Sequence, residues 1–146
     1  MKLYTIGFTR KSAEEFFRLL RQNGVLRVVD IRLRPSGQLA GFARKEDLPY
    51  FLKNLADGCE YTHLPILAPT KEILDGYRKG GRWVDYELKF QALMDERGIP
   101  GALDRESFEN QQSCLLCSEA TPEQCHRRLI AKRLQAHWPN VEIIHL

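Results

Sequence analysis

One short segment of the chain gathers most of the side chains that could do chemistry. Residues 115–128 read LLCSEATPEQCHRR and bring two thiols, carboxylates and an imidazole close to two guanidinium groups. The candidate catalytic residues are therefore Cys117, Glu119, Cys125 and His126. Thiols and imidazoles serve as nucleophiles, proton carriers, redox groups and metal ligands. The composition of the segment alone leaves all of these uses open.

Geometry narrows the uses of the thiols. Cys114 and Cys117 match the C-x-x-C pattern, but residues three apart on a strand point to opposite faces, so this pair can neither chelate nor form a bridge. A redox pair of Cys117 and Cys125 requires Cα atoms within about 7 Å, which a strand-to-helix turn permits. Zinc bound through Cys117, Cys125 and His126 is an alternative, but adjacent helical residues diverge by about 100° and rarely share one metal. We therefore assign no metal ligands and keep metal binding as an alternative.

The second thiol and the histidine are predicted to lie at the start of a helix. Thr121 is a typical capping residue, Pro122 suits the first helical position, and Gln124 completes a capping box. This pattern predicts a helix over 122–137. The first turn of a helix carries positive partial charge, which lowers the pKa of a nearby thiol and attracts anions. We expect a reactive thiolate here, with Arg127 binding an anionic substrate.

A purely structural interpretation of the same residues is also open. Buried cysteines commonly behave as small hydrophobic residues, and Cys125 would be one of them. His126 would then cap a neighbouring loop, and Arg127 would pair with Glu119 or Asp30. Access of the thiols to a pocket would separate this interpretation from the catalytic one.

Further polar side chains follow the first three predicted strands. Arg10 follows the first strand, and His63 ends the third. Asp30 and Arg32 end the second strand two residues apart, so they point to the same face and the carboxylate can hold the guanidinium. This arrangement is either a closed ion pair or an anion site made by Arg32 and Arg34. We expect these residues to bind the substrate, because the carboxyl ends of parallel strands share one edge of a sheet.

The elements that must position these residues alternate along the chain. Strands are predicted at 3–8, 25–32, 59–64, 114–118 and 141–145, and the apolar, β-branched run at 25–32 is typical of a strand covered on both faces. Helical spacing with capping residues predicts helices at 12–23, 47–57, 71–79, 84–97 and 122–137, with a short helical piece after Asp104. The segment 33–44 is rich in glycine, proline and serine and is predicted to be a loop.

This alternation of strands and helices predicts an α/β fold. We expect one domain, residues 1–146, with three α/β/α layers and about five mostly parallel strands. The sheet should be doubly wound, with extra helices between the third and fourth strands. Ligands of such folds bind beyond the carboxyl ends of the strands, where the candidate residues lie.

The bulk composition bounds the class of protein. The 146 residues are 43% hydrophobic, which suffices for a core, and no apolar run reaches the roughly 18 residues of a membrane span. No signal peptide is recognisable, so we expect a cytoplasmic protein with reduced thiols. The net charge of +3 is small for a dedicated nucleic-acid binder. Fourteen of the 22 basic residues are arginine, which favours an anionic ligand.

Four motifs together resemble a known family. They are Thr5-Ile6-Gly7, Asp30-x-Arg32-x-x-Pro35-Ser36, Tyr61-x-His63-Leu64-Pro65 and Leu116-Cys117-x-Glu119-x-x-Pro122-x-x-Cys125-His126-Arg127-x-x-Ile130-Ala131. Over nearly its whole length the chain is similar to the bacterial and archaeal family called domain of unknown function 488. The resemblance implies a compact α/β domain whose motif residues face one pocket. It supplies neither a reaction nor a cofactor.

We therefore predict a thiol-dependent hydrolase or transferase that acts on a phosphorylated or other anionic small substrate, such as a nucleotide. The arginines would bind the anion, Cys117 or Cys125 would attack, and Glu119 or His126 would carry protons. One alternative is a non-catalytic module that binds a nucleotide or nucleic acid, and a second is a metal-binding domain. The cofactor and the oligomeric state are left open, and no membrane partner is expected.

Overall fold

The chain folds around a parallel sheet. The computed structural model describes residues 1–37 and 40–146, and this part of the chain forms a five-stranded sheet in the order β3-β2-β4-β1-β5. Every neighbouring pair of strands is parallel. The bounds are Lys2–Gly7 for β1, Arg27–Asp30 for β2, Glu60–His63 for β3, Ser113–Cys117 for β4 and Glu142–His145 for β5. The predicted α/β class is confirmed.

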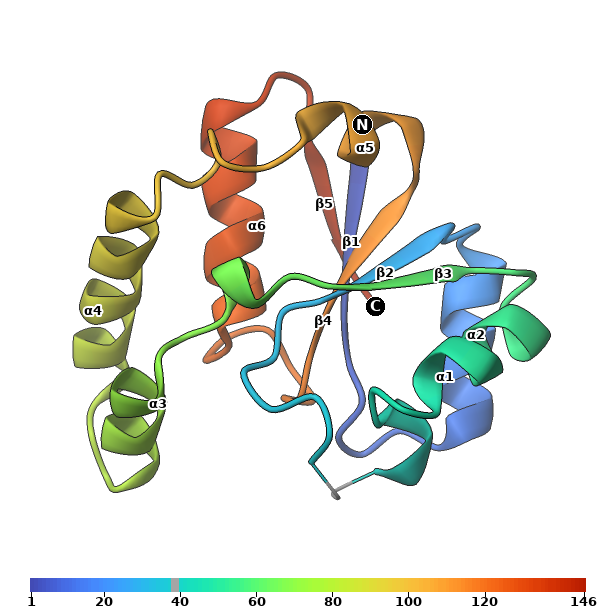
Figure 1. The fold of residues 1–146 in the computed structure, drawn as a ribbon, viewed down its shortest axis with the longest axis horizontal. Coiled ribbons are helices and arrows are strands. Elements are labelled where there is room, and N and C mark those ends of the chain that lie inside the picture. Colours follow the sequence, from blue (N-terminus) through green and yellow to red (C-terminus); the bar gives the residue numbers. More distant parts are fainter. Residues whose placement is uncertain (38–39) are drawn as a thin grey trace.

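Helices cover both faces of this sheet (Figure 1). The helices of one face are α1 (Ala13–Gln22) and α2 (Leu48–Leu55). The helices of the other face are α3 (Lys71–Arg78), α4 (Trp83–Glu96), α5 (Arg105–Asn110) and α6 (His126–His137). Short 3-10 turns lie at Gly41–Ala43 and Pro65–Leu67. The predicted extra helices between the third and fourth strands are therefore α3, α4 and α5, and α4 lies outside α6 (Figure 1).

The side chains of the central strand β4 alternate between two cores. Cys114 and Leu116 pack with α1 and α2, whereas Leu115 packs with α4 and α6. Cys117 follows Leu116 and therefore points toward the side of α4 and α6. The prediction that Cys114 and Cys117 face opposite ways is confirmed, so the C-x-x-C pattern forms no joint site.

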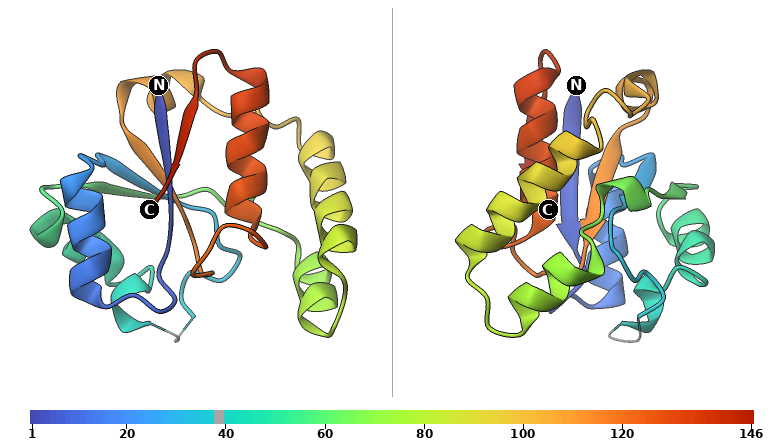
Figure 2. Two further views of the ribbon diagram at one scale, coloured as in Figure 1. Left: turned by 180° about the vertical axis from the view of Figure 1, so that it is seen from behind. Right: turned by 60° about the vertical axis from the view of Figure 1, so that its left-hand side comes forward.

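The winding of the chain opens a crevice at the carboxyl ends of β2 and β4. From β2 the chain enters the layer of α1 and α2, and from β4 it enters the layer of α6 (Figure 2). Neighbouring strands whose connections diverge in this way leave room between their loops, which is where doubly wound folds bind ligands. These two loops carry Arg32 and Arg34 after β2, and Ser118 and Glu119 after β4. Among the described residues, no helix combines the length and apolar composition needed to cross a membrane.

The predicted helices and strands begin and end within two residues of the observed ones, except that α6 starts later than predicted. The helix begins at His126, with Cys125 as an N-cap residue in extended conformation (φ −140°, ψ 138°). The predicted start at Pro122 is wrong. The guanidinium of Arg127 donates to the carbonyl oxygens of Glu119, at 2.5 Å, and Ala120, at 3.5 Å. These contacts hold the preceding segment in turns, so tertiary structure overrides the local capping signal.

Candidate functional site

A pocket opens at the carboxyl edge of the sheet, between the loops after β2 and β4 and the helices α3 and α4. It encloses about 650 Å³ of space, part of which is open solvent. All four predicted catalytic residues line it, namely Cys117, Glu119, Cys125 and His126. Arg32 is the predicted binding residue that also lines this pocket.

Cys117 and His126 form a hydrogen-bonded pair at the base of the pocket. The Sγ atom of Cys117 lies 3.4 Å from Nδ1 of His126, and Nε2 of His126 lies 2.7 Å from the carbonyl oxygen of Ile31. Because a carbonyl oxygen only accepts, Nε2 carries a proton, and in the neutral form of the ring Nδ1 presents its lone pair to the thiol. The backbone of the loop that follows β2 thus orients an imidazole that can accept the proton of Cys117.

The two pocket thiols differ in pKa. The neighbouring Cys125 thiol is the main cause that lowers the pKa of Cys117, against the opposing effect of burial. Burial is the main cause that raises the pKa of Cys125 well above its usual value, and the proximity of Cys117 acts in the same direction. Cys117 is therefore the thiol that ionises more readily, and Cys125 supports its charge as a donor.

Cys125 and His126 also converge, whereas the sequence reasoning expected adjacent residues to diverge and kept a shared metal only as an alternative. The Sγ atoms of Cys117 and Cys125 and a ring nitrogen of His126 all lie within 4.8 Å of one another. The expectation that the adjacent residues diverge is wrong because it assumed that both are helical. Cys125 is extended and only His126 is helical, so both side chains reach the same side as Cys117.

Arg127 is fully buried and does not line the pocket. Its Nη1 group donates to the carbonyl oxygen of Glu119 and lies 3.8 Å from Sγ of Cys125. The predicted role as an anion-binding residue therefore does not fit its placement. Its guanidinium instead holds the loop between β4 and α6. It lies close to Gly7 of β1, since a Cβ atom added to Gly7 would be 2.6 Å from Nη1 of Arg127.

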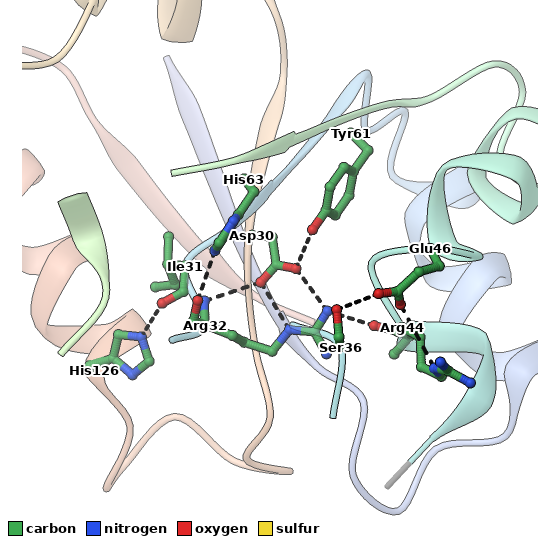
Figure 3. A network of polar contacts seen from close by, with 10 residues as sticks. Asp30, Ile31, Arg32, Ser36, Arg44, Glu46, Tyr61, His63 and His126 are labelled. Carbon is green, nitrogen blue, oxygen red and sulfur yellow. Dashed lines mark hydrogen bonds and ion pairs between the residues drawn. The ribbon is translucent and has the colours of Figure 1, made fainter. Parts of the chain in front are cut away.

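Asp30 organises the loop that follows β2 (Figure 3). Its buried carboxylate accepts hydrogen bonds from Nε and Nη2 of Arg32 at 2.9 and 2.7 Å, and from the Tyr61 hydroxyl at 2.7 Å. Nη2 of Arg32 also donates to the carbonyl oxygen of Ala43 at 2.5 Å. Nε2 of His63 lies 2.9 Å from the carbonyl oxygen of Arg32, so His63 binds the loop and does not line the pocket. Of the two interpretations of Asp30 and Arg32, the closed ion pair is the one that matches these contacts.

The remaining two predicted site residues are exposed. Arg10 adopts a left-handed conformation, with φ of 62°, and is not among the residues that line the pocket. Glu119 lines the pocket wall, and its backbone carbonyl oxygen binds Arg127. The structure therefore brings Glu119 to the site through the loop after β4 and leaves Arg10 outside it.

The family of the chain can now be stated. The sequence model for the domain of unknown function DUF488 matches residues 12–134, most of the chain. The chain belongs to the DUF488 family. No curated protein and no solved structure matches it.

The sequence reasoning missed one whole wall of the pocket in this DUF488 domain. This wall comes from α3, α4 and the loop before α6, and its residues are Leu74, Tyr77, Arg78, Trp83, Tyr86 and Gln124. Trp83 and Tyr86 stack with ring centroids 4.9 Å apart, and the Tyr77 hydroxyl donates to Oε1 of Gln124 at 2.9 Å. The spacing of Trp83 and Tyr86 on one helical face was a usable signal, but their contact with the cysteine loop is tertiary. Arg34 of the opposite loop lines the pocket as well.

Proposed function

We propose that this domain is a thiol-dependent hydrolase or transferase that acts on a small anionic molecule such as a nucleotide. The observation that carries the proposal is the pair made by Cys117 and His126. Its Sγ to Nδ1 distance is 3.4 Å, and the Ile31 carbonyl oxygen fixes the ring in the tautomer that accepts a proton. The pair lines a pocket instead of being sealed in the core.

The chemistry follows from this arrangement. Nδ1 of His126 takes the thiol proton, and Sγ of Cys117 forms a bond to an electrophilic carbon or phosphorus atom of the substrate. The bond to the leaving group breaks, the leaving group keeps the electron pair, and the proton on Nδ1 passes to it. Water in a hydrolase, or a second nucleophile in a transferase, then loses a proton to Nδ1 and cleaves the bond to sulfur. Cys117 is thereby regenerated.

The lining of the pocket supports an anionic, partly aromatic substrate. Arg34 from the loop after β2 and Arg78 from α3 both line the pocket, and guanidinium groups suit phosphate or carboxylate groups. Tyr77, Trp83 and Tyr86 contribute aromatic rings, and Trp83 is only partly buried. A nucleobase stacks well on such rings while its phosphate pairs with arginine. Nucleotides therefore match both halves of the lining.

Alkylation of the four thiols tests the proposal. At about pH 7, iodoacetamide should label Cys117 about tenfold or more faster than Cys59 and Cys114, measured by mass spectrometry of tryptic peptides. His126→Gln should abolish this difference because the thiol loses its proton acceptor. His137→Gln is the matched control, since His137 is exposed at the end of α6 and is not among the residues that line the pocket, and it should leave the difference intact. Equal labelling of all buried thiols, or an unchanged rate in His126→Gln, would refute the catalytic pair.

A non-catalytic nucleotide-binding module is the second candidate, and the same arginines and aromatic rings favour it. Cys117→Ser separates the two functions. It should keep the affinity for a nucleotide such as AMP in both cases, as measured by calorimetry. Turnover of a thiol-dependent enzyme would be lost in this variant, whereas a binding module has no turnover to lose.

A further inference from the structure

The geometry points to a second use of the same pocket, as a binding site for a zinc ion. The ligands would be Sγ of Cys117, Sγ of Cys125 and Nδ1 of His126; the two Sγ atoms and a ring nitrogen of His126 lie within 4.8 Å of one another. Two thiolates and an imidazole are a donor set that zinc prefers, and three protein ligands are typical of zinc sites that keep a position for another molecule. This inference does not depend on the proposed reaction.

The distances already approach those of a zinc complex. Zinc–sulfur bonds of about 2.3 Å and zinc–nitrogen bonds of about 2.0 Å at tetrahedral angles place sulfur and nitrogen about 3.5 Å apart. The observed separation of Cys117 Sγ and His126 Nδ1 is 3.4 Å. The extended N-cap conformation of Cys125 brings the third donor to the same side. Small side-chain rotations are therefore sufficient to close the site.

The surroundings of the donors are those of a metal-binding histidine. A histidine that binds a metal through one nitrogen commonly donates its other N–H to a carboxylate or a backbone carbonyl group. Nε2 of His126 donates to the Ile31 carbonyl oxygen at 2.7 Å, which leaves Nδ1 toward the thiols. The guanidinium of Arg127 lies 3.8 Å from Sγ of Cys125 and favours the negative charge that a ligating thiolate needs.

The charge of the complex suits a buried position. Two thiolates and a neutral imidazole offset the charge of a divalent cation, so the loaded site is neutral, whereas two unpaired thiolates would be strongly disfavoured there. Cys117 and Cys125 are both almost fully buried, with 5% and 2% exposure. All three donors nevertheless line the pocket, which gives the ion a route of entry.

A bound zinc ion would lower the nucleophilicity of Cys117. The ion withdraws electron density from Sγ, so a ligated thiolate attacks an electrophile more slowly than a free thiolate. Zinc would therefore protect Cys117 from alkylation, and a chelator would restore its reactivity. This consequence gives the site a readout that does not require a known substrate.

The full chain, treated with chelator and then dialysed against zinc, tests the inference. Wild type should retain about one zinc ion per chain by mass spectrometry of the metal, and cobalt in its place should show thiolate-to-metal absorption. Cys125→Ser keeps the size of the side chain and should lose the ion. Cys114→Ala is the matched control, because it removes a buried thiol of the opposite core and should keep the ion. Wild-type protein without stoichiometric zinc would overturn the inference, whatever the variants do.

Alkylation distinguishes this inference from the proposed function. With zinc at about ten times its dissociation constant, labelling of Cys117 should fall about tenfold, and chelator should reverse the effect. Fast labelling that zinc leaves unchanged would overturn the zinc site and leave the catalytic thiol standing. If the protein retains zinc but Cys117 of the metal-free protein is alkylated no faster than Cys114, the zinc site is supported and the catalytic thiol is refuted.

Discussion

Replacement of Gly7 by alanine should destabilise the protein and disturb the cysteine loop from a distance. A Cβ atom at Gly7 would lie 1.6 Å from the carbonyl oxygen of Glu119 and 2.6 Å from Nη1 of Arg127. Ordinary contacts of a Cβ begin near 3.4 Å, so the carbonyl group would have to move by roughly 1.8 Å. That movement breaks the 2.5 Å hydrogen bond between Arg127 and Glu119.

The size of the effect follows from these contacts. Overpacking of a tight site costs about 1–3 kcal/mol, and loss of a hydrogen bond to a charged group costs about 1.5–3 kcal/mol. The free energy of unfolding should therefore fall by about 3–5 kcal/mol. For a chain of this length, a loss of 1 kcal/mol lowers the melting temperature by about 2–4 °C, so Tm should fall by roughly 10 °C.

Urea denaturation, followed by circular dichroism, measures this change. Gly76→Ala is the matched control, because Gly76 lies in α3 and an added Cβ would meet nothing within 4 Å. Alanine in a helix should stabilise that variant by about 0.5–1 kcal/mol, so the two substitutions should act in opposite directions. A free energy of unfolding for Gly7→Ala within about 0.5 kcal/mol of wild type would show that β1 does not support the cysteine loop as described.

Three further predictions concern the elements around the site. Asp30→Asn should lower the free energy of unfolding by about 3 kcal/mol in urea titrations, because Arg32 then lacks its buried carboxylate; an unchanged midpoint would contradict this. Burial raises the pKa of Cys59 from 9.0 to about 12. Above about pH 9 the unfolded chain therefore loses a proton that the folded chain keeps, so the free energy of unfolding should fall as the pH rises. Cys59→Ala should make that fall shallower by up to about 1.4 kcal/mol per pH unit, and an identical pH profile would argue against the shift. Ser12→Ala should lower the free energy of unfolding by about 1 kcal/mol in the same urea assay, because the Ser12 hydroxyl caps α1 by accepting from the Glu15 amide at 3.1 Å. A decrease of less than a few tenths of a kcal/mol would show that this cap does not stabilise the helix.

The fold was predictable because its signals are local and repeated. Most of the strands are mainly apolar segments with turn residues nearby, with β3 (Glu60–His63) as an exception, and the alternation with helices leaves a parallel sheet as the simplest arrangement. The parallel sheet in turn placed Cys117 and Glu119 at the edge where ligands bind. All four residues of β2, Arg27–Asp30, are buried, which agrees with the prediction of a strand covered on both faces, although Arg27 and Asp30 are charged.

The start of α6 was not predictable from local signals. Thr121 and Pro122 form a good capping sequence, yet the helix begins four residues later. The competing interactions come from Arg127, whose guanidinium reaches back across the loop to two carbonyl groups, and from the space that Gly7 leaves beside them. Neither contact can be read from the segment itself, because both depend on how β1 and β4 pair. The error mattered, since a helical Cys125 would point away from His126.

The chemistry of the site depends most on a group that has no sequence signature at all. The Ile31 carbonyl oxygen selects the tautomer of His126, and any residue at that position would supply the same oxygen. The residues on either side of Ile31 set the position of this oxygen. The Asp30 carboxylate accepts hydrogen bonds from both the backbone amide and the side chain of Arg32. The predicted ion pair therefore acts on the site without contacting a ligand: by fixing the loop after β2, it aims the lone pair of His126 at Cys117. Asp30→Asn should accordingly slow alkylation of Cys117 even under conditions where the variant remains folded, which a purely stabilising ion pair would not do.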